Sequence, residues 1–269
     1  MAGGLKRLAT AAVGLPVFFV VIKFLHPWVF LALVCTAGVL ATFELNLMAR
    51  CRGIHGDRLL GAIFTVAVVL SFADERVDLA TVLVAAVILV PLRRLLSLRG
   101  VDGALESTAV TLMGIVFLGM TLGYMILLMG SGGEMGRDLT VLLFLVVWIS
   151  DAGAFYVGST LGRMKLAPRI SPNKTVEGAL GGLIIGTAAA WVAKLWFFHR
   201  LGMPDVFALG ALLWASGMAG DLVESLLKRS AAVKDCGTLF PGHGGMLDRT
   251  DSLLFGAPVL FYYYQAFMA

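Results

Sequence analysis

TAVTLMGIVFLGMTLGYMILLM, residues 108–129, is an apolar run without a single charged side chain. A helix of this length spans the hydrocarbon core of a bilayer, which is roughly 30 Å thick. Similar runs recur along the 269-residue chain, in which 59% of the residues are hydrophobic and 14% are charged, with a mean hydropathy of +0.92. Because soluble globular domains are far less apolar, this composition indicates a polytopic membrane protein.

The expected fold is all-α, with about nine transmembrane helices. The predicted spans are residues 8–25, 28–48, 59–73, 77–92, 108–129, 139–157, 177–198, 205–223 and 252–268. Lys6 and Arg7 precede the first span as in a signal peptide, but a retained anchor is simpler because the rest of the chain is equally apolar. We expect residues 1–106 to form a scaffold of about four spans. Residues 107–269 are then a catalytic region of about five spans, with cytosolic loops at 158–176 and 224–251.

The basic residues predict the orientation in the membrane. With the N-terminus in the cytosol, only five of the 21 Lys and Arg residues fall elsewhere, namely Lys23, Arg76, Arg137, Lys194 and Arg200. The odd number of spans then places the C-terminus on the outer side. The concentration of Lys and Arg on the cytosolic side also explains the net charge of +4, so no nucleic-acid partner is expected. The three cysteines are too few and too scattered for a disulfide framework or a metal site, and they are Cys35, Cys51 and Cys236.

Five acidic residues lie at or inside the cytosolic ends of the predicted spans, namely Glu44, Asp151, Glu177, Asp221 and Asp251. A carboxylate at such a depth needs a partner, a cavity or an ion. Their convergence predicts one polar cavity that opens to the cytosol and binds a cation. The alternative is that each one snorkels or pairs with a neighbouring arginine. That alternative suits Glu44, whereas Asp151 lies deeper in an apolar run and suits a functional role.

Two spacings add to the case for a cation site. If span eight continues as a helix, its polar residues share one face, and these are Asp221, Glu224, Ser225 and Lys228. Asp248 and Asp251 are three residues apart at the start of the last span, so they can share a divalent cation. They can equally serve as N-terminal caps of that helix.

The stretch KDCGTLFPGHGGMLDRTD, residues 234–251, is a strongly polar segment in an otherwise apolar chain. Its segment from Pro241 to Gly245 offers backbone amides that no side chain obstructs, as a phosphate cradle requires, although a plain turn has the same composition. Four cations surround it, namely Lys228, Arg229, Lys234 and Arg249. Free amides, basic groups and paired carboxylates together indicate a metal-bound polyphosphate, and hence a reaction that joins a nucleotide to a lipid head group.

RMKLAPRISPNKTVEG, residues 163–178, is a second polar block. Its end predicts a turn that runs into a capped helix. Lys174 and Arg169 are also placed to meet a second anion. By contrast, Gly178, Gly182 and Gly186 recur every four residues, which is a helix-packing pattern.

Residues 225–251 resemble the signature of the phosphatidate cytidylyltransferases, also called CDP-diacylglycerol synthases. The matching pieces are Ser225 to Arg229, the pair Lys234 and Asp235, and the run from Pro241 to Asp251. The SPNKTVEG stretch and the many spans are also similar to that family. The first 130 residues carry no such motif.

The resemblance implies that CTP reacts with phosphatidic acid to give CDP-diacylglycerol and pyrophosphate. It also implies a magnesium-dependent homodimer in the bacterial inner membrane, with its active site facing the cytosol. We expect a centre of two cations, of which one is Mg²⁺ and the second is unknown. The implied metal ligands are Asp221, Asp248 and Asp251, and the implied catalytic set adds Lys228, Lys234 and Arg249. The implied substrate-binding residues are Ser171, Lys174, Glu177, Ser225, Arg229, Asp235, His243, Gly244 and Gly245.

Two other functions stay open at this point. Another CTP-dependent lipid enzyme, such as a polyprenol kinase or an ether-lipid cytidylyltransferase, could share basic loops and intramembrane acids. An ion-coupled transporter also has many spans with buried acids. The transporter is disfavoured because the polar groups gather at one face of the membrane and no inverted repeat is visible in the sequence.

Overall fold

The computed structural model describes residues 18–97, 100–233 and 245–269. Its long elements are α2 (Pro27–Arg50), α3 (Arg58–Ser71), α4 (Leu79–Leu95), α5 (Ala104–Gly130), α6 (Glu134–Leu161), α7 (Val176–Trp196), α8 (Met203–Ser230) and α9 (Leu247–Phe267). A short helical segment, residues 18–24, precedes α2. The all-α class is therefore confirmed, with one addition: a two-stranded hairpin of β1 (Lys165–Ala167) and β2 (Ser171–Thr175).

Each predicted span from the second to the ninth coincides with one of the helices α2 to α9. Most of the first span, 8–25, lies outside the described residues. Among the described helices, α2, α5, α6, α7 and α8 are long and apolar enough to cross a membrane, and α3 is a shorter apolar helix. The total of nine crossings and the orientation stay predictions.

Several helices extend beyond their predicted bounds. α6 continues to Leu161 and α8 to Ser230, and α9 already begins at Leu247. The stretch between α8 and α9 is thus shorter than the predicted loop 224–251. The helix ends were predicted too early because charged residues such as Lys228 and Arg229 end an apolar run but do not end a helix.

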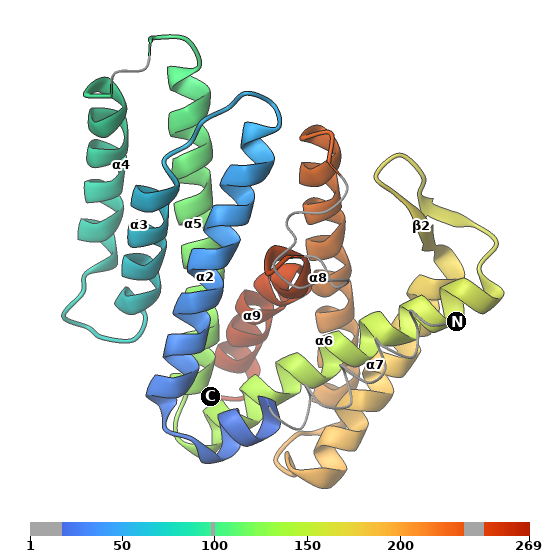
Figure 1. Ribbon diagram of the computed structural model, residues 1–269. Coiled ribbons are helices and arrows are strands. Elements are labelled where there is room, and N and C mark those ends of the chain that lie inside the picture. The colour runs from blue at the N-terminus through green and yellow to red at the C-terminus, as the bar shows by residue number, and fades with distance from the viewer. Residues whose placement is uncertain (1–17, 98–99, 234–244) are drawn as a thin grey trace.

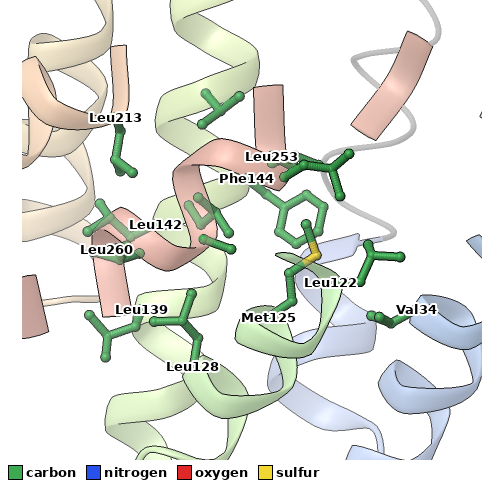
Figure 2. Close-up of a cluster of buried hydrophobic side chains, with 14 of the residues drawn as sticks. Val34, Leu122, Met125, Leu128, Leu139, Leu142, Phe144, Leu213, Leu253 and Leu260 are labelled. Carbon is green, nitrogen blue, oxygen red and sulfur yellow. The ribbon is translucent and has the colours of Figure 1, made fainter. Parts of the chain in front are cut away.

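Helix α9 occupies the middle of the bundle (Figure 1). Helices α2 to α5 gather on one side of it, and α7, α8 and the hairpin lie on the other. The core follows α9, where Leu253 and Leu260 pack with Leu142 of α6 and Leu213 of α8 (Figure 2). Leu122 and Met125 of α5 continue the same cluster towards α2. The apolar faces of both sides therefore meet at the last helix of the chain.

The predicted capped helix after the second polar block is confirmed. The side chain of Thr175 caps α7, because its Oγ1 accepts the backbone N–H of Gly178 over 3.1 Å. The residues before it form the antiparallel hairpin, in which Lys165 pairs with Thr175 and Ala167 pairs with Ser171. Strands this short, one of which contains Pro172, leave no alternating pattern in the sequence.

The glycines of α7 let that helix lie directly against α6. A Cβ added to Gly178 would come within 2.7 Å of the Ala154 carbonyl oxygen, and one added to Gly182 would come within 3.0 Å of the Ser150 carbonyl oxygen. Ser150 also donates from its Oγ to the Gly182 carbonyl oxygen over 3.0 Å. The packing role predicted for this glycine repeat is confirmed.

Candidate functional site

Three carboxylates from two helices converge at the centre of the site. Asp221 and Glu224 of α8 and Asp251 of α9 each offer one oxygen, and these oxygens all lie within 4.8 Å of one another. Asp221 and Glu224 are three residues apart and therefore share a helix face. Glu224 is buried, and the two aspartates are half-buried. The group is called the carboxylate cluster below.

Helix α6 and the hairpin reach the same place. The Asp151 carboxyl accepts a hydrogen bond from the Ser252 hydroxyl and lies within electrostatic range of Asp221. From β2, the Lys174 ammonium pairs with Asp221 Oδ2 over 2.6 Å. The second polar block thus supplies a cation to the cluster. That Lys174 and Arg169 meet a second anion stays a prediction.

Lys228 joins the cluster to a further carboxylate. Its Nζ lies 2.6 Å from Glu224 Oε2 and 2.6 Å from Asp248 Oδ1. The side chains of this triad are mostly shielded, with 14% of Lys228 and 5% of Glu224 exposed. Removing charges from water is costly, and the shared ammonium offsets part of the repulsion between the two carboxyl groups.

Glu44 of α2 caps the N-terminus of α9. Its two carboxylate oxygens accept the backbone N–H groups of Met246 over 2.8 Å and of Leu247 over 2.7 Å. These amides belong to the first turn of a helix and have no partner within it. Asp248 Oδ2 accepts a third amide, that of Gly245, over 2.8 Å. Glu44 is therefore a cap of α9 in the structure, and it forms no ion pair with an arginine of the described residues, which was one of the two roles expected for it.

Glycine permits the close approach of α8 and α9 at the cluster. A Cβ on Gly220 would lie 2.3 Å from the backbone oxygen of Asp251, a distance that real side chains do not reach. Gly220 directly precedes Asp221 in α8. The same contact therefore brings Asp221 and Asp251 together.

The remaining predicted residues lie around this centre in different ways. Ser225 Oγ donates to Asp221 Oδ1 over 3.4 Å, and Arg229 Nε donates to the Ile170 carbonyl oxygen over 3.2 Å. Glu177 accepts the amide of Arg163 over 3.0 Å and that of Met164 over 3.2 Å, so it holds the base of the hairpin. Ser171 is half-buried in β2, and Arg249 is exposed on α9. Lys234, Asp235, Cys236, His243 and Gly244 lie outside the described residues.

The carboxylate cluster fits a divalent cation. Mg²⁺ takes oxygen ligands at about 2.0–2.1 Å, so opposite ligands are about 4.2 Å apart, close to the spread of the three oxygens. Fully ionised, Asp151, Asp221, Glu224, Asp248 and Asp251 outnumber the two ammoniums of Lys174 and Lys228. Such an excess of negative charge within a helix bundle calls for cations.

Glu224 is the residue that sequence reasoning did not place in the metal set. The predicted ligands were Asp221, Asp248 and Asp251, and the structure gathers Glu224 with the first and third of these. Asp248 does not belong to the cluster but is joined to it by Lys228, whose Nζ pairs with the Asp248 carboxylate. The signal for Glu224 was present, because its position three residues after Asp221 had already put it on the polar face of α8.

Comparison with known proteins adds an independent line of evidence. A family model described as "Cytidylyltransferase family" matches residues 5–267. A phosphatidate cytidylyltransferase of Bacillus subtilis (strain 168) is 43% identical over 149 residues, which are 55% of this chain and 54% of the relative. One of Synechocystis sp. is 45% identical over 132 residues, 48% of this chain and 43% of the relative. One of Staphylococcus saprophyticus is 41% identical over 154 residues, which are 57% of this chain and 58% of the relative. Each match thus spans about half the length of the curated relatives.

Proposed function

The chain belongs to the cytidylyltransferase family, and we propose that it transfers the cytidylyl group of CTP to phosphatidic acid. The products are CDP-diacylglycerol and pyrophosphate. The observation that carries this proposal is the carboxylate cluster flanked by the ammoniums of Lys174 and Lys228. The names of the relatives agree with it, since those proteins are called phosphatidate cytidylyltransferases.

In the proposed step, an oxygen of the phosphatidic acid phosphate attacks the α-phosphorus of CTP in line. A bond forms between that oxygen and the α-phosphorus, and the bond from the α-phosphorus to the bridging oxygen of the β-phosphate breaks. The attacking phosphate carries a charge of about −1.5 to −2 at neutral pH, by analogy with other phosphomonoesters. It therefore needs no dedicated general base.

The main obstacle to this step is the repulsion between two anionic phosphates, together with the charge that builds up on the leaving pyrophosphate. Lys174 and Lys228 are the cations that the structure places against the cluster, and we assign them to the phosphates of the two substrates. Each is held by a carboxylate 2.6 Å away, so each is positioned before a substrate arrives. Preorganised charge of this kind stabilises a transition state without costly rearrangement.

We propose that Asp221, Glu224 and Asp251 hold Mg²⁺, with Asp248 beside them at a second cation or at Lys228. When bound, such a cation supplies charge neutralisation and orientation of the phosphates. The protein's own contribution is to fix the carboxylates on rigid helices, which Gly220 and the Glu44 cap achieve. Lys234, Arg249 and His243 complete the proposed phosphate-binding set.

The proposal also covers the setting of the reaction. CTP arrives from water, whereas phosphatidic acid keeps its acyl chains in the bilayer, so the site must be reached both from the cytosol and sideways from the lipid. We propose the cytosolic face of a bacterial inner membrane as that place, and a homodimer as the working form. The five long apolar helices agree with a membrane protein of this kind.

The test is a product assay on the purified full chain. Micelles that contain phosphatidic acid receive CTP labelled at its α-phosphate, with Mg²⁺ or with EDTA. We expect a labelled liponucleotide and an equal amount of pyrophosphate with Mg²⁺ and neither product with EDTA. Release of CDP instead would identify a lipid kinase and overturn the proposal, and so would the absence of any product under these conditions.

A matched pair of variants connects the activity to the cluster. Asp221→Asn removes one charged oxygen from it, whereas Asp74→Asn makes the same change at an exposed position outside it. We expect Asp221→Asn to lower kcat by at least about a hundredfold, or roughly 2.7 kcal/mol in the barrier. Asp74→Asn is expected to match the parent chain. Equal turnover in the two variants would contradict the assignment.

A further inference from the structure

A cavity that no residue of the carboxylate cluster lines lies between the loop after α2 and the ends of α3, α4 and α5. It has a volume of about 790 Å³, within the range of roughly 300–1,000 Å³ that is usual for small-molecule sites. Among the described residues, four arginines line it, namely Arg50, Arg58, Arg93 and Arg94, and Asp57 is the one carboxylate. It is called the arginine cavity below.

Two of these arginines are already engaged by the protein. Arg93 of α4 forms an ion pair with Asp57. Arg94 donates to the Ser97 hydroxyl over 2.9 Å and to the Gly100 carbonyl oxygen over 2.6 Å. Their guanidinium groups are therefore held in place at the wall of the cavity.

Asp57 is the residue that fixes the shape of this wall. Its side chain caps α3 by accepting the Leu60 amide over 2.9 Å, and its own amide donates to Thr111 Oγ1 of α5 over 2.9 Å. Burial would raise the pKa of this carboxyl, but the Leu60 hydrogen bond and the Arg93 guanidinium hold the pKa below its ordinary value. Asp57 thus stays ionised and ties three helices together around the cavity.

The other two arginines have donors to spare. Arg50 Nε is buried and has no hydrogen-bond partner in the described part of the chain. Arg58 lies over the Phe43 ring, with its guanidinium carbon 5.9 Å from the ring centroid, and makes no ion pair with any described residue. A buried donor without a partner is costly, so this arrangement is suited to an anion with several acceptor oxygens.

The apolar part of the lining indicates which class of molecule carries that anion. Leu59, Leu89 and Leu96 line the same cavity and are 58%, 43% and 76% exposed. A small soluble anion would leave them uncovered, whereas a phospholipid presents a phosphate and acyl chains together. The end of α2 also lies beside the end of α8, since Arg52 Nε donates to the Ser230 carbonyl oxygen over 2.7 Å.

We infer that the arginine cavity is a binding site for an anionic glycerophospholipid, distinct from the reaction site. The lipid phosphate accepts hydrogen bonds from Arg50 and Arg58, and the acyl chains run along the exposed leucines. This inference does not depend on the proposed reaction, because the carboxylate cluster takes no part in it.

Native mass spectrometry of the full chain in a neutral detergent tests the inference with three probes. Dioleoyl phosphatidylglycerol carries a phosphate and acyl chains, dioleoylglycerol carries the chains alone, and glycerol 3-phosphate carries the phosphate alone. We expect phosphatidylglycerol to bind at least about tenfold more tightly than either of the others. Equal binding of dioleoylglycerol would overturn the role of the phosphate, and equal binding of glycerol 3-phosphate would overturn the role of the lipid.

Matched arginine variants locate the bound lipid. Arg58→Gln removes one free cation from the cavity, and Arg200→Gln makes the same charge change at an exposed position outside it. We expect Arg58→Gln to bind phosphatidylglycerol about tenfold more weakly and Arg200→Gln to bind it as the parent chain does. Because Arg58 is exposed, its replacement is not expected to unfold the chain, and a melting curve checks this. The same affinity in both variants would overturn the inference.

Discussion

Glu44 and Leu247 are 203 positions apart in sequence, and a hydrogen bond of 2.7 Å joins the carboxylate of the first to the amide of the second. The second oxygen of Glu44 accepts the Met246 amide in the same way. A helix of the N-terminal half therefore completes the helix that carries Asp248 and Asp251. A buried carboxylate at a helix N-terminus is also favoured by the helix dipole.

Replacing Glu44 tests this capping role. Glu44→Ala leaves one buried and one half-buried amide without a partner, so we expect the free energy of unfolding to fall by about 3 kcal/mol. Glu44→Gln keeps one acceptor oxygen, so its free energy of unfolding should lie between that of the parent chain and that of Glu44→Ala. Unfolding by denaturing detergent, followed by circular dichroism, measures both. Glu106→Ala, which changes an exposed glutamate in α5, serves as the control. A Glu44→Ala chain as stable as this control would show that the cap is dispensable.

Gly220 offers a test of how closely α8 and α9 must approach. In Gly220→Ala the new methyl group would meet the Asp251 carbonyl oxygen at 2.3 Å, so the helices must move apart. We expect a loss of about 1–3 kcal/mol in stability and a larger loss in turnover. Gly217→Ala is the matched control, because a Cβ there would meet Ser252 at an ordinary 3.5 Å. If Gly220→Ala and Gly217→Ala had the same stability and the same turnover, this account would be refuted.

Lys228 is expected to matter for stability as well as for catalysis. Lys228→Gln leaves Glu224 and Asp248 facing each other without their shared cation, and such a loss costs about 3–5 kcal/mol at a buried site. We also expect the KM for CTP or for phosphatidic acid to rise. Lys165→Gln, at an exposed position in β1, controls for the change of charge. Unchanged stability together with an unchanged KM for both substrates would exclude both roles.

The sequence predicted the helices well because each one is a long apolar run, and the bilayer leaves such runs few other conformations. It predicted the ends poorly. Lys228 and Arg229 interrupt hydropathy but are good helix formers, so α8 continues through them to Ser230. The hairpin before α7 was missed because its strands carry no period of two.

The polar face of α8 was predictable from spacing within one helix. Contacts between distant segments were not. Nothing local indicates that Glu44 caps α9 or that Lys174 pairs with Asp221, since both depend on how the helices pack. For the same reason the choice between Glu224 and Asp248 as the third carboxylate of the cluster required the fold.

That choice can be settled by measuring cation binding directly. Mn²⁺ stands in for Mg²⁺ and is detected by electron paramagnetic resonance, so the readout does not depend on activity. If Glu224 is the third ligand, Glu224→Gln should bind Mn²⁺ at least about tenfold more weakly, whereas Asp248→Asn, whose carboxylate lies across Lys228, should bind it within a few-fold of the parent chain. Glu106→Gln, which changes an exposed glutamate of α5, controls for the loss of one negative charge. The opposite order, with Asp248→Asn the weaker binder, would restore Asp221, Asp248 and Asp251 as the metal set and leave Glu224 as the partner of Lys228 alone.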